Sequence, residues 1–155
     1  MPTPDAPQPP VPTPQISVRL VDQPISLDEL WGQIADEDCG AQLVFVGRTR
    51  RHTQSDETVA VTTELSYEAF RPMAVKELEK LLAEAAEKWP LRHLLGVHRL
   101  GDVPVGQASV AIALASPHRD ACMQAMPWIM DQLKTRVPVW KQERFEDGSS
   151  EWIHP

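Results

Sequence analysis

The sequence predicts an α+β fold in which a largely antiparallel sheet packs against helices. Several predicted strands follow one another without an intervening helix, which favours hairpins over the parallel sheet of a doubly wound fold. Neither GxxxxGK[ST] nor GxGxxG occurs, so a phosphate group would be held by side chains rather than by a glycine-rich loop. With 155 residues, of which 42% are hydrophobic, the chain can form one domain with its own core.

The N-terminal segment, residues 1–15, holds seven of the fifteen prolines. Proline donates no backbone hydrogen bond, so it cannot extend a helix or a sheet. We therefore expect a disordered tail over residues 1–15, followed by a single domain over residues 16–155. A polyproline II ligand for another protein is the alternative for this tail.

The first half of the domain is expected to begin with a half-buried strand over residues 16–20, where apolar and polar residues alternate. Ser26 and Glu29 have the spacing of a capping box, which predicts a helix that runs to about Asp38. The apolar residues 41–47 then predict a buried strand, and the polar residues 48–58 predict a mobile loop. A second strand is expected directly after this loop.

The second half is expected to alternate helices and strands. An apolar stripe over residues 74–89 predicts a helix that Pro90 ends. Residues 94–116 predict two strands joined by a turn rich in glycine and proline. A third helix is expected over residues 118–136, where Pro127 should kink it unless a neighbouring group satisfies the freed carbonyl. One more strand is expected after this helix.

The charge balance limits the classes of function. A formal net charge of −7 argues against a general nucleic-acid binder, which would carry a broad basic face. The proline-rich start does not resemble a signal peptide, and no apolar run reaches the roughly 20 residues that span a membrane. We expect a cytoplasmic protein in which Cys39 and Cys122 are packing residues. We expect that neither cysteine carries sulfur as part of the protein's activity. A Cys39→Ser, Cys122→Ser variant that folded but lost activity would contradict this expectation.

Three basic segments lie at the ends of predicted elements, where functional residues often gather. They are GRTRRH at residues 47–52, SPHRD at residues 116–120 and LKTRVPVWK at residues 133–141. Each alone fits a solvated loop, and the helix dipole explains one or two cations in the last helical turn. It does not explain why Trp140 stands beside Lys141 in the third segment.

Together, these segments predict one pocket for an anionic small molecule, lined by Arg50, His118, Arg119, Lys134 and Lys141. Arginine presents a planar fork that fits phosphate, whereas lysine is a point charge. A lysine whose pKa is lowered by burial near other cations can act as an acid, a base or a nucleophile near neutral pH. The arginines would then hold the substrate and a lysine would carry the chemistry.

Five motifs, in the same order over roughly residues 16–153, resemble the large, catalytic subunit of molybdopterin synthase. They are FVGRTRRH, LSYEAF, VHRLG, ASPHRDA and IMDQLKTRVPVWKQE, of which the last is the most specific. The resemblance implies a hammerhead-type α/β arrangement within the α+β class. It also implies a sulfurtransferase of molybdenum cofactor biosynthesis.

The implied reaction transfers two sulfurs to cyclic pyranopterin monophosphate and forms the dithiolene of molybdopterin. The resemblance implies that the sulfurs come from the thiocarboxylated C-terminal glycine of a small, ubiquitin-like partner subunit. It also implies a central homodimer within a heterotetramer, and no metal or other cofactor is expected. Because the C-terminal SEWIHP has no Gly-Gly end, the chain is not expected to be its own sulfur donor.

The resemblance also implies roles for individual residues. Lys134 and Lys141 match the catalytic lysines, and Lys134 matches the essential one. The residues implied to bind substrate are Arg50, His118, Arg119 and Phe45. The central dimer implies that some of them serve the neighbouring protomer's pocket. For Phe45, a position in the hydrophobic core is the alternative to lining the pocket.

Two other functions remain open at this level. A scaffold subunit could bind a pterin phosphate with the same cations and perform no chemistry. A phosphate-ester hydrolase is the third candidate, although neither a carboxylate cluster suited to a metal nor a nucleophile elbow is visible in the sequence.

Overall fold

The computed structural model describes residues 12–55 and 58–153, and within these ranges it has nine strands and three helices. In chain order they are β1 (Gln15–Val21), α1 (Leu27–Gln33), β2 (Ala41–Arg48), β3 (His52–Ser55), β4 (Thr58–Ala69), α2 (Arg71–Lys88), β5 (His93–Arg99), β6 (Gly101–Pro104), β7 (Ala108–Ser116), α3 (Arg119–Arg136), β8 (Val139–Phe145) and β9 (Ser150–Ile153). The predicted disordered tail falls mostly on residues 1–11, which lie outside the described residues. Residues 12–14 have no regular structure, and Gln15 begins β1.

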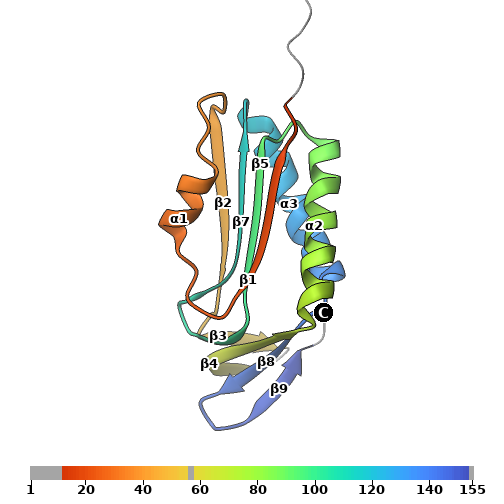
Figure 1. Cartoon of the computed structure of the whole chain (residues 1–155). Coiled ribbons are helices and arrows are strands. Elements are labelled where there is room, and N and C mark those ends of the chain that lie inside the picture. Colours follow the sequence, from red (N-terminus) through yellow and green to blue (C-terminus); the bar gives the residue numbers. More distant parts are fainter. Residues whose placement is uncertain (1–11, 56–57, 154–155) are drawn as a thin grey trace, which may run out of the picture.

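The larger sheet has the strand order β1-β5-β7-β2. β1 and β5 are parallel, whereas β5 with β7 and β7 with β2 are antiparallel. Figure 1 shows α2 and α3 along one face of this sheet and the short α1 on the other. The predicted α+β class with a largely antiparallel sheet is therefore confirmed.

The core lies on both faces of the larger sheet. Because side chains alternate along a strand, Leu94 of β5 packs with α2 and α3, while Leu95 and Val97 pack with α1 on the other face. The apolar stripe predicted for the second helix is buried, with Leu78 and Leu81 fully inaccessible to solvent. Burial on both faces explains why β5 and β7 read as continuous apolar segments.

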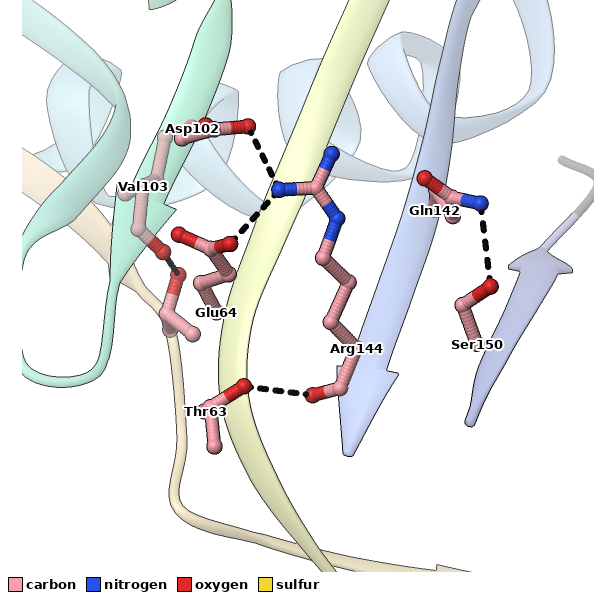
Figure 2. A network of polar contacts seen from close by, with 8 residues as sticks. Thr63, Glu64, Asp102, Val103, Gln142, Arg144 and Ser150 are labelled. Carbon is pink, nitrogen blue, oxygen red and sulfur yellow. Dashed lines mark hydrogen bonds and ion pairs between the residues drawn. The ribbon is translucent and has the colours of Figure 1, made fainter. Parts of the chain in front are cut away.

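The smaller sheet lies at one end of the larger sheet, near the C-terminal end of α3 (Figure 1). Its strand order is β3-β4-β8-β9, and β6 also pairs with β4. On one face, Arg144 Nη1 lies 2.6 Å from Glu64 Oε1 and 3.2 Å from Asp102 Oδ1, so it links β8, β4 and β6 (Figure 2). Gln142 donates to Ser150 across β8 and β9 on the same face. These contacts hold β8 in register against its neighbours.

The first helix is shorter than predicted, since α1 ends at Gln33 and not near Asp38. The carboxylate of Asp36 accepts a hydrogen bond from the backbone N–H of Asp38 at 2.9 Å, and this local turn replaces helical hydrogen bonding. Ser26 caps the helix as predicted, because its Oγ accepts from the backbone N–H of Glu29 at 3.4 Å. In a complete capping box the Glu29 side chain would accept from the backbone N–H of Ser26. Here that side chain forms an ion pair with Arg19 of β1.

Three strands were not predicted, and all of them depend on pairing within the smaller sheet. β3 lies inside the predicted mobile loop and pairs with β4, with His52 opposite Val61. β6 lies in the predicted turn and pairs with the same strand. β9 follows a hairpin at Gly148, whose φ of +85° is accessible to glycine at little cost. The predicted strands at β1, β2, β4, β5 and β7 are confirmed, and β8 is the strand expected after the third helix.

The third helix is continuous through Pro127. Proline removes the hydrogen bond that the carbonyl of Met123 would accept, but both residues are exposed to solvent. Water can therefore satisfy this carbonyl, and the helix continues to Arg136. None of the described helices, α3 included, is long and apolar enough to cross a membrane.

Candidate functional site

A cavity of about 860 Å³ lies where the two sheets meet the C-terminal end of α3. Among the residues predicted from the sequence, its walls include Arg50, Lys134, Lys141 and Phe45. They come from β2, the segment after it, α3 and β8. Four of the six predicted site residues are thus brought together within one chain.

Strand alternation in β8 determines which of its side chains reach the cavity. Lys141 and Glu143 line the cavity, while Gln142 and Arg144 contribute to the network on the opposite face. Trp140 is also directed away from the cavity and is 40% exposed. Its position beside Lys141 in the sequence therefore does not make it part of this pocket.

The last turns of α3 form another wall of the cavity. Met130, Leu133, Lys134 and Val137 line it at the spacing of one helical face. Lys134 lies in the final turn, where the negative end of the helix dipole favours a cation. The end of the helix thus contributes to the cavity wall both the exposed ammonium group of Lys134 and the apolar side chains beside it.

The segment between β2 and β3 is anchored by Thr49, which is only 2% exposed. Its hydroxyl donates to the carbonyl of Val103 at 3.0 Å, and its backbone N–H donates to the carbonyl of Gln107 at 3.1 Å. The two arginines beside it, Arg48 and Arg50, both line the cavity. Arg48 was not among the predicted site residues, although it belongs to the same GRTRRH motif as Arg50.

Phe45 lies on the rim of the cavity and not in the core, with 39% of its surface exposed. Further along β2, a Cβ atom at Gly47 would lie 2.7 Å from Cγ1 of Val110. Only glycine therefore lets β2 approach β7 this closely at the edge of the cavity. The strand pairing shifts register at this point, between Gly47 and Arg48.

His118 and Arg119 do not line this cavity. His118 caps the start of α3 and Arg119 is its first residue, whereas Lys134 lies in the last turn. Fifteen residues of helix separate Arg119 from Lys134, which corresponds to roughly 22 Å along the axis. Both side chains are exposed at the far end of the helix.

Part of the cavity wall consists of buried polar groups that were not predicted. Glu143 is 3% exposed, and its Oε1 accepts hydrogen bonds from the hydroxyls of Thr53 and Thr62. His98 is 5% exposed, and its ring lies edge-on to Tyr67 with the centroids 4.9 Å apart. Sequence signals for both existed: Glu143 stands two residues after Lys141 on one strand, and His98 belongs to the VHRLG motif.

The two cysteines lie outside this cavity, and both are unpaired. Cys39 lines a shallower hollow of about 580 Å³ beside α1, and Cys122 is buried in α3. Burial raises the pKa of both thiols, which makes thiolate formation unfavourable. Within residues 12–55 and 58–153, no three His, Cys, Asp or Glu side chains gather in a way that could hold a metal ion.

Comparisons of the sequence point to one family. The profile of the MoaE protein family matches residues 20–136. The chain is 47% identical over 137 residues to the molybdopterin synthase catalytic subunit of Drosophila sechellia, covering 87% of this chain and 36% of that protein. It is 41% identical over 135 residues to the bovine protein of the same name, covering 87% of this chain and 69% of that protein. The chain thus spans about a third of the length of the fly relative.

Solved structures agree with the sequence comparisons. The crystal structure of molybdopterin synthase from Staphylococcus aureus matches with a TM-score of 0.80 and 35% identity, covering 88% of this chain and 96% of that one. A protein complex of subunits 1 and 2 of the molybdopterin-converting factor from Helicobacter pylori matches with a TM-score of 0.68 and 21% identity, covering 88% of each chain. The second likeness concerns the fold alone.

Proposed function

The chain belongs to the MoaE protein family, and we propose that it is the catalytic subunit of a molybdopterin synthase. In the proposed reaction, two sulfurs pass from the thiocarboxylated C-terminus of a small, ubiquitin-like subunit to cyclic pyranopterin monophosphate. The product is the dithiolene of molybdopterin. The names of the fly and bovine relatives support this assignment.

The observation that carries the proposal is the gathering of cations in one cavity. Arg48, Arg50, Lys134 and Lys141 all line it, although the whole chain has a formal net charge of −7. Its volume of about 860 Å³ falls within the range of roughly 300–1,000 Å³ that is typical of small-molecule sites. The cavity therefore suits a small anionic substrate better than an extended nucleic acid.

The cations differ in the roles that they can perform. Arg48 and Arg50 can present planar forks to the phosphate group of the substrate. Lys134 and Lys141 enter from a helix end and a strand, so their ammonium groups can approach a bound substrate from different directions. We assign Lys134 the essential proton-transfer role and Lys141 a supporting one.

The proposed sulfur donor must insert an anionic C-terminal tail into the same cavity. The likeness to the molybdopterin synthase from Staphylococcus aureus supports this proposal. The exposed Phe45 at the rim offers an apolar contact to an entering chain. A thiocarboxylate at the end of that chain would be attracted by the lysines.

A homodimer gives His118 and Arg119 a function that one protomer does not provide. Both lie at the far end of α3 from Lys134, so they are too distant to serve the same cavity. In a symmetric dimer, the exposed start of α3 in one protomer can complete the cavity of its neighbour. We therefore assign these two residues to phosphate binding across the dimer interface.

A single-turnover assay tests the proposed function. The purified chain is mixed with cyclic pyranopterin monophosphate and a thiocarboxylated small subunit, and the dithiolene product is detected by mass. The proposal expects product without added metal or nucleotide. Binding of both partners without any product would refute the enzyme and favour the scaffold alternative.

The scaffold alternative also makes a distinct prediction for Lys134. If the chain only binds its ligands, a Lys134→Ala variant that still binds them retains its function. If the chain is an enzyme, that variant should bind its ligands and fail in turnover.

As part of the same proposal, the protein acts in the cytoplasm, where unpaired cysteines are common.

A further inference from the structure

The cationic cavity also contains a buried carboxylate with one oxygen left free. Both threonine hydroxyls, from Thr53 and Thr62, contact Oε1 of Glu143. Among the residues that the structure describes, none donates a hydrogen bond to Oε2 of Glu143, and no cation lies within 4.0 Å of this carboxylate. Glu143 nevertheless lines the cavity and is 3% exposed. Oε2 of Glu143 is therefore an acceptor in the cavity wall that has no donor among the described residues.

His98 is a second acceptor of the same kind. Its Nδ1 lies 2.9 Å from the backbone carbonyl of Arg99, and because a carbonyl only accepts, Nδ1 must carry the proton. Burial, together with the charge of Lys141, lowers the pKa of His98 to about 4, so the ring is neutral at pH 7. Nε2 is then unprotonated, and no residue in the described ranges donates to it.

The ring of His98 is also held in place. Tyr67 packs against it edge-on at 69°, and Tyr67 is itself 9% exposed. The carboxylate of Glu143 is similarly held by its two threonines, whose hydroxyls lie 3.1 Å from each other. These acceptors are therefore preorganised and do not need a ligand to orient them.

Neither acceptor is sealed from solvent, since the fully buried unpaired side-chain atoms of the described residues are Nε of Arg19 and Nε of Arg99. A ligand that fills the cavity and displaces water from these two acceptors must therefore supply N–H or O–H groups of its own. The anionic tail of a sulfur donor does not fit here, because a second carboxylate-like group beside Glu143 would be repelled. A phosphate group fits no better for the same reason. A planar heterocycle with amino and ring N–H groups does fit, since it presents several donors along one edge.

We propose that Glu143 and His98 form a subsite that recognises the N–H donor edge of the substrate's pterin ring, Oε2 of Glu143 accepting one hydrogen bond and Nε2 of His98 another. The inference rests on the proposed function and deepens it. The cavity then has two parts with opposite chemistry. The arginines and lysines bind the phosphate, and the acceptor wall selects the ring.

The variant Glu143→Gln tests the subsite with little change in shape. The amide oxygen can still accept from Thr53 and Thr62, while an NH₂ group replaces the free oxygen and turns an acceptor into a donor. We expect binding of cyclic pyranopterin monophosphate, measured by calorimetry, to weaken by about 10- to 100-fold. Binding of inorganic phosphate should not weaken, because this probe has no N–H edge and the substitution removes a negative charge from the cavity.

Arg50→Ala provides the matched control, since it should weaken binding of both probes. If Glu143→Gln binds the pterin as tightly as the unmodified chain, the subsite is wrong. If Glu143→Gln does not fold, His98→Gln decides the question in the same way, with a loss of about 10-fold expected for the pterin alone.

The binding measurement and the single-turnover assay, made on the same purified proteins, distinguish a failure of the subsite from a failure of the proposed function. If the unmodified chain makes dithiolene and Glu143→Gln binds the pterin normally, only the subsite is overturned. If the unmodified chain neither binds the pterin nor makes product, the proposed function and the subsite both fail.

Discussion

The guanidinium of Arg136 pairs with both carboxylate oxygens of Glu84, with Nη1 2.7 Å from Oε2 and Nη2 3.0 Å from Oε1. This pair joins the C-terminal end of α3 to α2. The Arg136 hydrogen bond lowers the pKa of Glu84, so the carboxylate is charged through the neutral range. Arg136 therefore stabilises the helix end that carries Lys134, and it is not one of the cations that line the cavity.

Arg136→Ala should lower the free energy of unfolding by roughly 1 kcal/mol, because it removes a bidentate but partly exposed ion pair. Urea denaturation measures the change. Glu84→Ala should cost a similar amount, and the double variant should cost less than the sum of the two, since the same interaction is lost. Strict additivity would show that the pair contributes nothing.

Lys134→Ala should keep the fold and nearly abolish product in the single-turnover assay, because it removes the lysine that we propose as the essential proton-transfer group. Lys141→Ala should reduce product less completely. The control is Lys76→Ala, an exposed lysine of α2 far from the cavity walls, which should leave turnover unchanged. A fully active Lys134→Ala protein would overturn the assignment.

Arg119→Ala and Lys134→Ala should complement each other if Arg119 serves the neighbouring protomer. Each variant alone has two defective cavities, whereas a mixed dimer has one intact cavity and one with both changes. Purified mixed dimers should therefore recover about half of the turnover of the unmodified dimer. Such dimers can be isolated with two affinity tags on co-expressed chains.

No recovery in the mixed dimer would show that Arg119 acts within its own protomer or only on folding. Full turnover by Arg119→Ala alone would remove it from the site altogether. Circular dichroism of each variant checks that the fold is kept in either case.

Stability should fall as the pH drops from about 6.5 to about 4, because of His98. Its pKa is lowered to about 4 in the folded protein from 6.5, so the unfolded chain binds more protons in this window. The full effect is about 3 kcal/mol. Glu143 and Tyr67 line the same cavity, as does Lys141, whose charge contributes to the lowered pKa of His98.

Urea unfolding at several pH values between 7 and 4 measures this slope. His98→Gln should flatten it, since glutamine does not titrate. Asp36, whose pKa is lowered to about 2 by the Asp38 backbone N–H and by His93, begins to lose its contribution to stability below about pH 5. It does so in both proteins, so the difference between their slopes isolates His98. An unchanged slope in His98→Gln would show that another group is responsible.

Much of the fold could be predicted because its elements have local patterns. The apolar stripe of α2, the alternation in β1 and the continuous apolar segments of β5 and β7 are visible without tertiary information. β3, β6 and β9 could not be predicted, because short polar strands form only when β4 or β8 is present to pair with them. The early end of α1 likewise depends on a side-chain contact within one turn.

The sequence by itself determined the fold class, and it predicted an anion site built from basic segments at element ends. The tertiary structure decided which of the cations in those segments line the cavity. It gathered Arg48, Arg50, Lys134 and Lys141, paired Arg136 with Glu84, and separated Arg119 from Lys134 by the length of α3. The physical reason is that charge and periodicity are properties of residues, whereas pairing, burial and the direction of an acceptor depend on which elements meet in space.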